Sequence, residues 1–147
     1  MTGSAYQDRV DRFARMLMQQ AAWPAALVVA ANILAPLAAS ARGAFETLPA
    51  ALALSTTAAT AVAVLALSAL LAFDALLFRL MGSHNDEASG GAAVDDMLAR
   101  MRLKPAASTT RTLEDRMAGT GRLLFKQRTA LALFAVALLA AGFWAPR

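Results

Sequence analysis

The sequence contains no cysteine and a single histidine, His84, among its 147 residues. Disulfides, thiolate metal sites and cysteine nucleophiles are therefore excluded. A haem with two axial histidines and a histidine-rich zinc site both need more ligands than the chain has. The sequence also lacks a phosphate-binding glycine motif and a nucleophile paired with a base, so we expect no catalytic site, no metal and no cofactor.

Charged residues are scarce as well. They make up 16% of the chain, whereas hydrophobic residues make up 59% and the mean hydropathy is +0.51. Soluble domains typically have about 25% charged residues. The charges gather between three apolar runs, which is the arrangement of a polytopic membrane protein, and the length allows for one domain.

The three apolar runs are long enough to cross a bilayer. They cover residues 21–41, 52–78 and 129–145. The first is 21 residues long and uncharged, which corresponds to about 31 Å of helix. The third is short, but Lys126 and Arg128 can snorkel to headgroups and let the preceding residues extend it. The sequence therefore predicts an all-α integral membrane protein with three transmembrane helices.

Basic residues are distributed very unevenly over the flanks of these spans. Residues 1–20 and the loop 79–128 together hold twelve, whereas the link 42–51 and the C-terminal tail hold one each. Because cytoplasmic flanks retain positive charge, we expect the N-terminus and the long loop inside and the C-terminus outside. Heavy use of alanine, and of arginine over lysine, is typical of GC-rich bacterial genomes, so we expect a bacterial inner (plasma) membrane.

An alternative interpretation makes residues 1–41 a cleaved secretory signal. It has a basic start, an apolar centre and small residues at Ala39 and Ala41. Asp8 and Asp11 in an overlong first region argue against it. Cleavage would leave two spans and would not change the topology of the remainder.

The segment 1–20 carries an apolar stripe at helical spacing. Its members are Tyr6, Val10, Phe13 and Leu17. The pattern predicts an amphipathic helix lying in the headgroups, as an anchor or as a run-in to the first span. Pro24 is expected to mark the bend between this helix and the span.

The cytoplasmic loop 79–128 is expected to contain short helices. Its polar, glycine-rich start at 83–91 is predicted to be mobile. An apolar stripe around Val94 and Leu98 predicts a helix that Pro105 ends, and Thr112 is expected to be the N-cap of a second helix that Gly119 and Gly121 weaken.

A basic cluster follows in the second of these helices. It consists of Arg116, Arg122, Lys126 and Arg128. Such a cluster can bind anionic lipid headgroups or an acidic partner, although a positive-inside signal alone would look the same. Because the basic residues flank apolar segments, we expect lipid and not nucleic acid as their partner.

Two neighbouring positions make the first span polar near its middle. Asn32 lies there, and Pro36 leaves the backbone carbonyl of Asn32 without its helical donor. In a carrier, such a broken helix can coordinate an ion. In a structural subunit, Asn32 would bond across a helix interface, which we favour because the chain has no second broken helix.

Asp74 is the one acid inside an apolar run, about one turn from its cytoplasmic end. We expect it to pair with Lys126 or Arg128, with proton relay as the alternative. Thr56 and Thr60, together with many alanines, give the second span a small, hydroxylated surface that suits close helix packing.

Taken together, these features favour a non-catalytic accessory subunit or assembly factor that docks on other membrane protein chains or on itself. Three such helices hardly enclose a substrate cavity unaided. The alternative is a small transport component or an oligomeric, holin-like pore that uses Asn32, Pro36 and Asp74.

Overall fold

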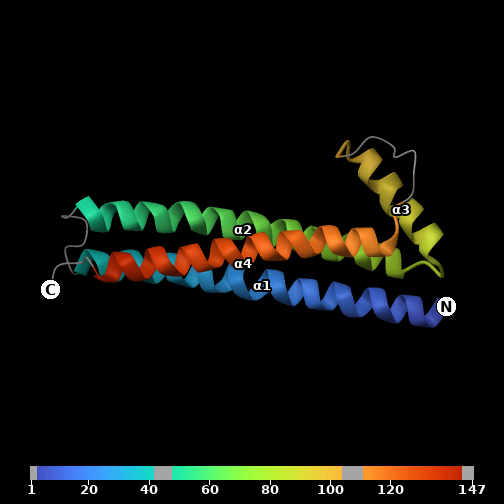
Figure 1. Ribbon diagram of the computed structural model, residues 1–147, viewed down its shortest axis with the longest axis horizontal. Helices are drawn as coiled ribbons and strands as arrows, with labels where there is room; N and C mark the ends of the chain where they lie inside the picture. The colour runs from blue at the N-terminus through green and yellow to red at the C-terminus, as the bar shows by residue number, and fades with distance from the viewer. Residues whose placement is uncertain (1–2, 42–47, 104–110, 144–147) are drawn as a thin grey trace. The chain divides into compact units, whose positions relative to one another are not determined.

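Helix is the only regular secondary structure in the computed structural model over the residues that it describes, 3–41, 48–103 and 111–143 (Figure 1). The elements are α1 (Gly3–Ala41), α2 (Leu48–Gly82), α3 (Glu87–Arg100) and α4 (Leu113–Phe143). Three of these helices, α1, α2 and α4, are long and apolar enough to cross a membrane. The predicted all-α membrane fold is therefore confirmed.

The three long helices exceed what a bilayer requires. At 1.5 Å per residue, the 39 residues of α1 extend about 58 Å, the 35 of α2 about 52 Å and the 31 of α4 about 46 Å. The hydrocarbon core of a bilayer is only about 30 Å thick. Each helix therefore continues for several turns beyond the length that the hydrocarbon needs.

The helix boundaries differ from the sequence-based ones at two places. α1 runs unbroken through Pro24 and Pro36, so the expected division between a surface helix and the first span is not a helix boundary. Pro24 is fully buried, and packing around its ring offsets the hydrogen bond that proline removes. α2 begins at Leu48, before the predicted residue 52, with Pro49 in the first turn, where a missing N–H is harmless.

Most of the described part of the long loop is helical. The prediction that residues 83–91 are mobile is wrong for 87–91, which form the first turns of α3. Asp86 is the N-cap, and its carboxylate accepts a hydrogen bond from the Ser89 N–H at 2.8 Å. Gly119 and Gly121 do not interrupt α4, whereas Pro105 lies outside the described residues.

The chain divides into two compact units. We call Met1–Gln20 with Leu70–Leu123 the charged unit, and Ala21–Ala69 with Leu124–Arg147 the apolar unit. The charged unit holds ten basic and nine acidic residues, whereas the apolar unit holds four basic and one acidic. The division thus follows the charge pattern of the sequence.

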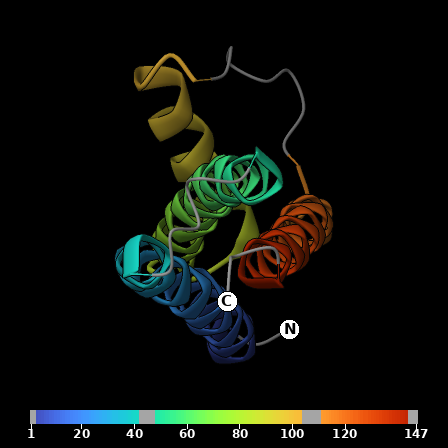
Figure 2. The ribbon, with the colours of Figure 1, turned by 90° about the vertical axis from the view of Figure 1, so that its left-hand side faces the viewer.

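The apolar unit is a bundle of three helices that stand side by side in the end-on view of Figure 2. Its core is small: Val28 of α1, Ala61 and Val64 of α2, and Phe134 of α4 form one buried cluster. Other large apolar side chains point outwards, such as Leu139, which is 74% exposed. A small cluster of buried side chains between the three helices therefore forms the core of this unit.

Candidate functional site

The first turns of α1 belong to the core of the charged unit. The apolar stripe predicted from the sequence is present, and its buried members are at most 5% exposed. They are Tyr6, Val10, Ala14 and Leu17. Phe13 packs edge-on against Phe78 of α2, with ring centroids 4.9 Å apart. The prediction that this stripe lies in lipid headgroups is wrong, because other helices of the chain cover it.

Gly90 allows α3 to approach the end of α2 and the start of α1. A Cβ atom at this position would lie 2.8 Å from the Met81 carbonyl oxygen and 2.9 Å from the Tyr6 hydroxyl. Side chains do not tolerate contacts that close, so the site requires glycine. In the sequence, Gly90 suggested a loop. In the structure, it permits close packing of α3 against α2 and α1.

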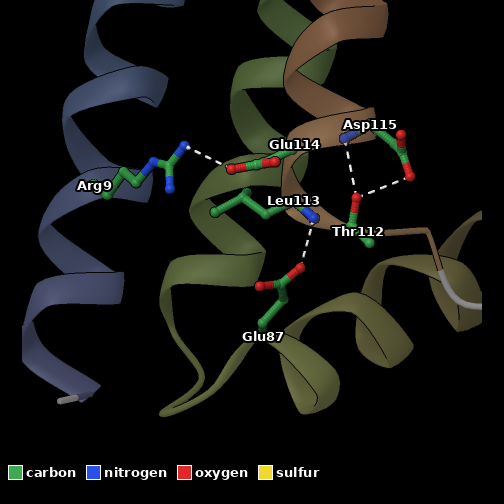
Figure 3. A network of polar contacts seen from close by, with 6 residues as sticks. All are labelled: Arg9, Glu87, Thr112, Leu113, Glu114 and Asp115. Atoms are coloured by element: carbon green, nitrogen blue, oxygen red, sulfur yellow. Dashed lines mark hydrogen bonds and ion pairs between the residues drawn. The ribbon is translucent and has the colours of Figure 1, made fainter. Parts of the chain in front are cut away.

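The N-terminus of α4 is tied to α3 and is capped as predicted (Figure 3). The Thr112 hydroxyl accepts a hydrogen bond from the Asp115 N–H at 3.2 Å and donates one to the Asp115 carboxylate at 2.8 Å. Glu87 of α3 accepts a hydrogen bond from the Leu113 N–H at 2.6 Å. A carboxylate from another helix therefore satisfies a donor that α4 itself leaves open.

Two ion pairs of very different exposure join helices of the charged unit. Arg116 of α4 pairs with Asp95 of α3 at 2.9 Å, and the side chains are only 11% and 18% exposed. Arg9 of α1 and Glu114 of α4 are 3.7 Å apart and much more exposed, so this pair contributes little. Arg116 is consequently a structural residue of the unit, contrary to its expected place among the headgroup-binding residues.

A cleft of about 260 Å³ opens beside the buried ion pair. Apolar residues of α2 and α3 form one part of its lining, namely Phe73, Leu77, Phe78, Met81, Val94 and Leu98. The other part comprises Asp74, Arg111, Asp115, Arg116, Gly119 and Thr120. Over the described ranges, no group of three or more histidine, aspartate or glutamate side chains is placed to hold a metal ion.

Asp74 lies in the lining of this cleft and is partly buried. Its Oδ2 accepts a hydrogen bond from the Thr120 hydroxyl at 3.0 Å, whereas the prediction was an ion pair with Lys126 or Arg128. The ion pairs found in the described part of the chain do not include these three residues. The prediction failed because α4 begins at Leu113, so its early turns, and not the start of the predicted span, lie beside Asp74.

The predicted polar spot in the first span faces outwards. Asn32 and Pro36 are exposed, and the Asn32 amide donates to the Val28 carbonyl of its own helix at 2.8 Å. The expected hydrogen bond across a helix interface is therefore not made within this chain. The amide instead satisfies one backbone acceptor on the outer face of α1.

The hydroxyls of the second span also bond within their own helix. Thr56 donates to the Leu52 carbonyl at 2.9 Å and Thr60 to the Thr56 carbonyl at 2.8 Å. Both line a shallow groove of about 470 Å³ between α2 and α4 in the apolar unit, opposite Leu133 and Val136. The groove is mostly apolar, and the hydroxyls of these two threonines already donate to backbone carbonyls of α2.

The remaining basic candidates, Arg122, Lys126 and Arg128, are all exposed on α4. None of them enters an ion pair with another residue in the part of the chain that the structure covers. Their binding to headgroups or to an acidic partner remains a prediction.

Polar contacts that hold helices together could not be recognised from the sequence. In the apolar unit, the buried Gln127 amide donates to the Ser68 hydroxyl of α2 at 2.8 Å. Gln127 stands between Lys126 and Arg128 and therefore looks like part of a solvated flank. Asp95 is next to Val94, a residue of the apolar stripe. This position beside a buried face was the available signal that Asp95 could pair with a basic residue away from water.

Comparison with protein-family models, with curated proteins and with solved structures finds no match to this chain.

Proposed function

We propose that this chain is a non-catalytic accessory subunit or assembly factor of a membrane complex. The observation that carries the proposal is that most residues of the spanning helices are not buried by other parts of this chain. In the most apolar stretch of each spanning helix, 17%, 33% and 22% of the residues are buried. Because a pore or substrate cavity must be enclosed by helices, such a bundle is better suited to packing against neighbouring membrane chains.

The charged unit would then be the part that stands outside the hydrocarbon. It contains nearly all the charges, and the surplus length of the helices reaches well beyond a bilayer. We place it in the cytoplasm of a bacterial cell, with the chain in the inner membrane and its C-terminus outside, because twelve basic residues flank one side. Arg122, Lys126 and Arg128 would contact anionic headgroups there.

Photo-crosslinking from the spans tests the accessory function. A photoreactive residue replaces Leu34 or Leu139, which are 64% and 74% exposed, in the full-length protein in its native membrane. We expect adducts with one defined heterologous chain. The matched controls are the buried Val28 and Phe134, which should give none. Adducts with lipid alone, or with copies of this chain alone, would contradict the proposal.

Single-cysteine labelling tests the orientation, because the chain has no cysteine of its own. Ser83→Cys lies just after α2 and Leu48→Cys at its first residue, and both positions are exposed. A membrane-impermeant maleimide applied to intact cells should label Leu48→Cys and leave Ser83→Cys unlabelled until the cells are opened. The reverse pattern would invert the topology.

A second candidate, an oligomeric pore or small transport component, is favoured by the exposed Asn32. A polar side chain on the outer face of a span is costly in lipid, so copies of the chain could meet there. Ion flux through reconstituted protein that Asn32→Ala or Asp74→Asn abolishes would support this candidate. Toxicity on overexpression with loss of membrane potential would favour its holin-like form.

A further inference from the structure

The cleft of the charged unit contains a partly buried carboxylate, Asp74, that has no ion-pair partner among the described residues. Asp74 is partly buried in its lining, and its carboxylate accepts a hydrogen bond from the neutral Thr120 hydroxyl at 3.0 Å. No cation pairs with Asp74 anywhere in the described ranges. Removing a carboxylate from water without a positive partner is unfavourable, so this position would stabilise an incoming positive charge.

The other charged groups of the lining do not cancel this charge. Arg116 is already neutralised by Asp95 at 2.9 Å. Arg111 and Asp115 are both exposed, carry opposite signs, and are screened by water and salt. When Asp74 is ionised, it makes the partly buried part of the cleft negative.

The apolar part of the lining suits a cation with an organic body. Phe73 and Phe78 contribute aromatic rings, and Leu77 and Met81 contribute aliphatic surface. Aromatic rings attract ammonium and guanidinium groups, most strongly when these are withdrawn from water. The volume of about 260 Å³ falls just below the range of roughly 300–1,000 Å³ for sites of drug-sized ligands, so the ligand must be small.

Gly119 lines the cleft but contributes no side chain to it. A Cβ added at this glycine would meet nothing within 4 Å, so a larger side chain has room to grow into the space that a ligand would use. Gly121 is equally open and lies on the same helix, but it does not line the cleft. The two glycines therefore form a matched pair for testing occupancy.

We propose that this cleft binds a small organic cation, an ammonium or guanidinium group on an apolar body, with Asp74 as its counter-ion. The cation can come from a free amine-type molecule or from a lysine or arginine side chain of a partner that docks on the subunit. The recognition chemistry is the same in both cases.

Titration calorimetry of the full-length protein in phosphatidylcholine nanodiscs tests the proposal, with benzyltrimethylammonium as the probe. We expect saturable binding that Asp74→Asn weakens at least tenfold, because the amide can still accept from Thr120 but carries no charge. Gly119→Leu should abolish binding and Gly121→Leu should leave it unchanged. Benzylsulfonate, which has the same ring and the opposite charge, should not compete.

Several results would overturn the proposal. Equal affinity in Asp74→Asn, or competition by benzylsulfonate, would mean that charge is not recognised. Equal affinity in Gly119→Leu, or no saturable heat at all, would mean that the cleft is not the site. Unchanged helicity and thermal unfolding of each variant, measured by circular dichroism, separate these results from misfolding.

Crosslinking with the Asp74→Asn protein distinguishes the two sources of the cation. If Asp74→Asn abolishes both probe binding and the heterologous crosslinked adduct, the cation belongs to a partner's side chain. If probe binding is lost and the adduct is retained, the cation belongs to a free molecule. Because the titration uses purified protein, probe binding can be detected even if no partner is crosslinked. Crosslinking to a partner can likewise be detected even if the probe does not bind, so the two proposals can fail separately.

Discussion

The contacts inside the charged unit differ in kind from the contacts inside the apolar unit. In the charged unit, polar side chains reach from one helix to another, as in the Asp95–Arg116 pair and the hydrogen bond from Leu113 to Glu87. In the apolar unit, most polar side chains bond back to their own helix, as Asn32 and Thr56 do. The buried contact between Gln127 and Ser68, by contrast, joins α4 to α2.

This difference agrees with the proposed placement of the charged unit in water and of the apolar unit in lipid. Where water competes for polar groups, a buried contact between helices is specific because breaking it leaves a group unsatisfied. Inside lipid, a hydroxyl that is not needed elsewhere can return to a backbone carbonyl of its own helix. We therefore expect substitutions of polar residues to cost more in the charged unit than in the apolar unit.

The largest effect is expected from Asp95→Ala. It would leave Arg116 in a site where only 11% of its side chain is exposed, without its counter-ion. We expect the free energy of unfolding to fall by about 3 kcal/mol, the lower end for broken buried pairs, because the site is not fully buried. Reversible unfolding by SDS in mixed micelles measures the change.

Two companion variants sharpen this result. Glu114→Ala removes the exposed partner of Arg9 and should change stability by less than about 0.5 kcal/mol. Combining Asp95→Leu with Arg116→Leu should recover most of the loss, since no charge is then left unpaired. If the double variant lost as much stability as Asp95→Ala, the unpaired charge of Arg116 would not be the cause of the loss.

The next effect is expected from Gly90→Ala. The added Cβ would press on the Met81 carbonyl at 2.8 Å, and this backbone atom cannot move aside as a side chain can. We expect a loss of about 1–3 kcal/mol, together with earlier proteolysis of α3. The control is Gly121→Ala, which has open space and should be neutral or stabilising by up to about 1 kcal/mol.

A smaller effect is expected from Gln127→Leu in the apolar unit. It removes the donor to Ser68, whose hydroxyl can then bond to its own helix. Hydrogen bonds between membrane helices contribute about 0.6 kcal/mol on average, so the loss should lie near that value. A loss as large as that of Asp95→Ala would remove the contrast between the two units.

The smallest effect concerns pH and the N-cap of α3. The hydrogen bond from the Ser89 N–H lowers the pKa of the Asp86 carboxyl below its usual value near 3.9. A lowered pKa in the folded state stabilises the fold above the unfolded pKa, and this contribution is lost as the pH falls through the folded pKa. The protection of the Ser89 amide, measured as its exchange rate relative to the intrinsic rate at each pH, should therefore decrease at acidic pH.

Asp86→Asn is the control for this pH effect. Asparagine also caps helices but does not titrate in this range, so exchange in the variant should lack the acidic step. The same step in both proteins would assign it to another group.

Several features could be predicted from particular residues. The uncharged stretch 21–41 identifies a span, Thr112 with Asp115 identifies the start of α4, and the spacing of Tyr6, Val10 and Leu17 identifies an apolar helix face. Each depends on neighbours within one or two helical turns, which sequence spacing contains directly. The place of Asp74 in a cleft could not be predicted, since it depends on which turn of α4 packs beside it, and the spacing within one helix does not contain that register.

The sequence by itself determined the helical fold, the three apolar segments and the positions of several helix ends, because these follow from local propensity and from hydropathy. Only the tertiary structure decided what covers the stripe of Tyr6 and Val10, which cation Asp95 meets and why Gly90 is a glycine. Those outcomes depend on contacts between residues far apart in the chain, and the periodicity of one helix carries no information about which surface another helix will present to it.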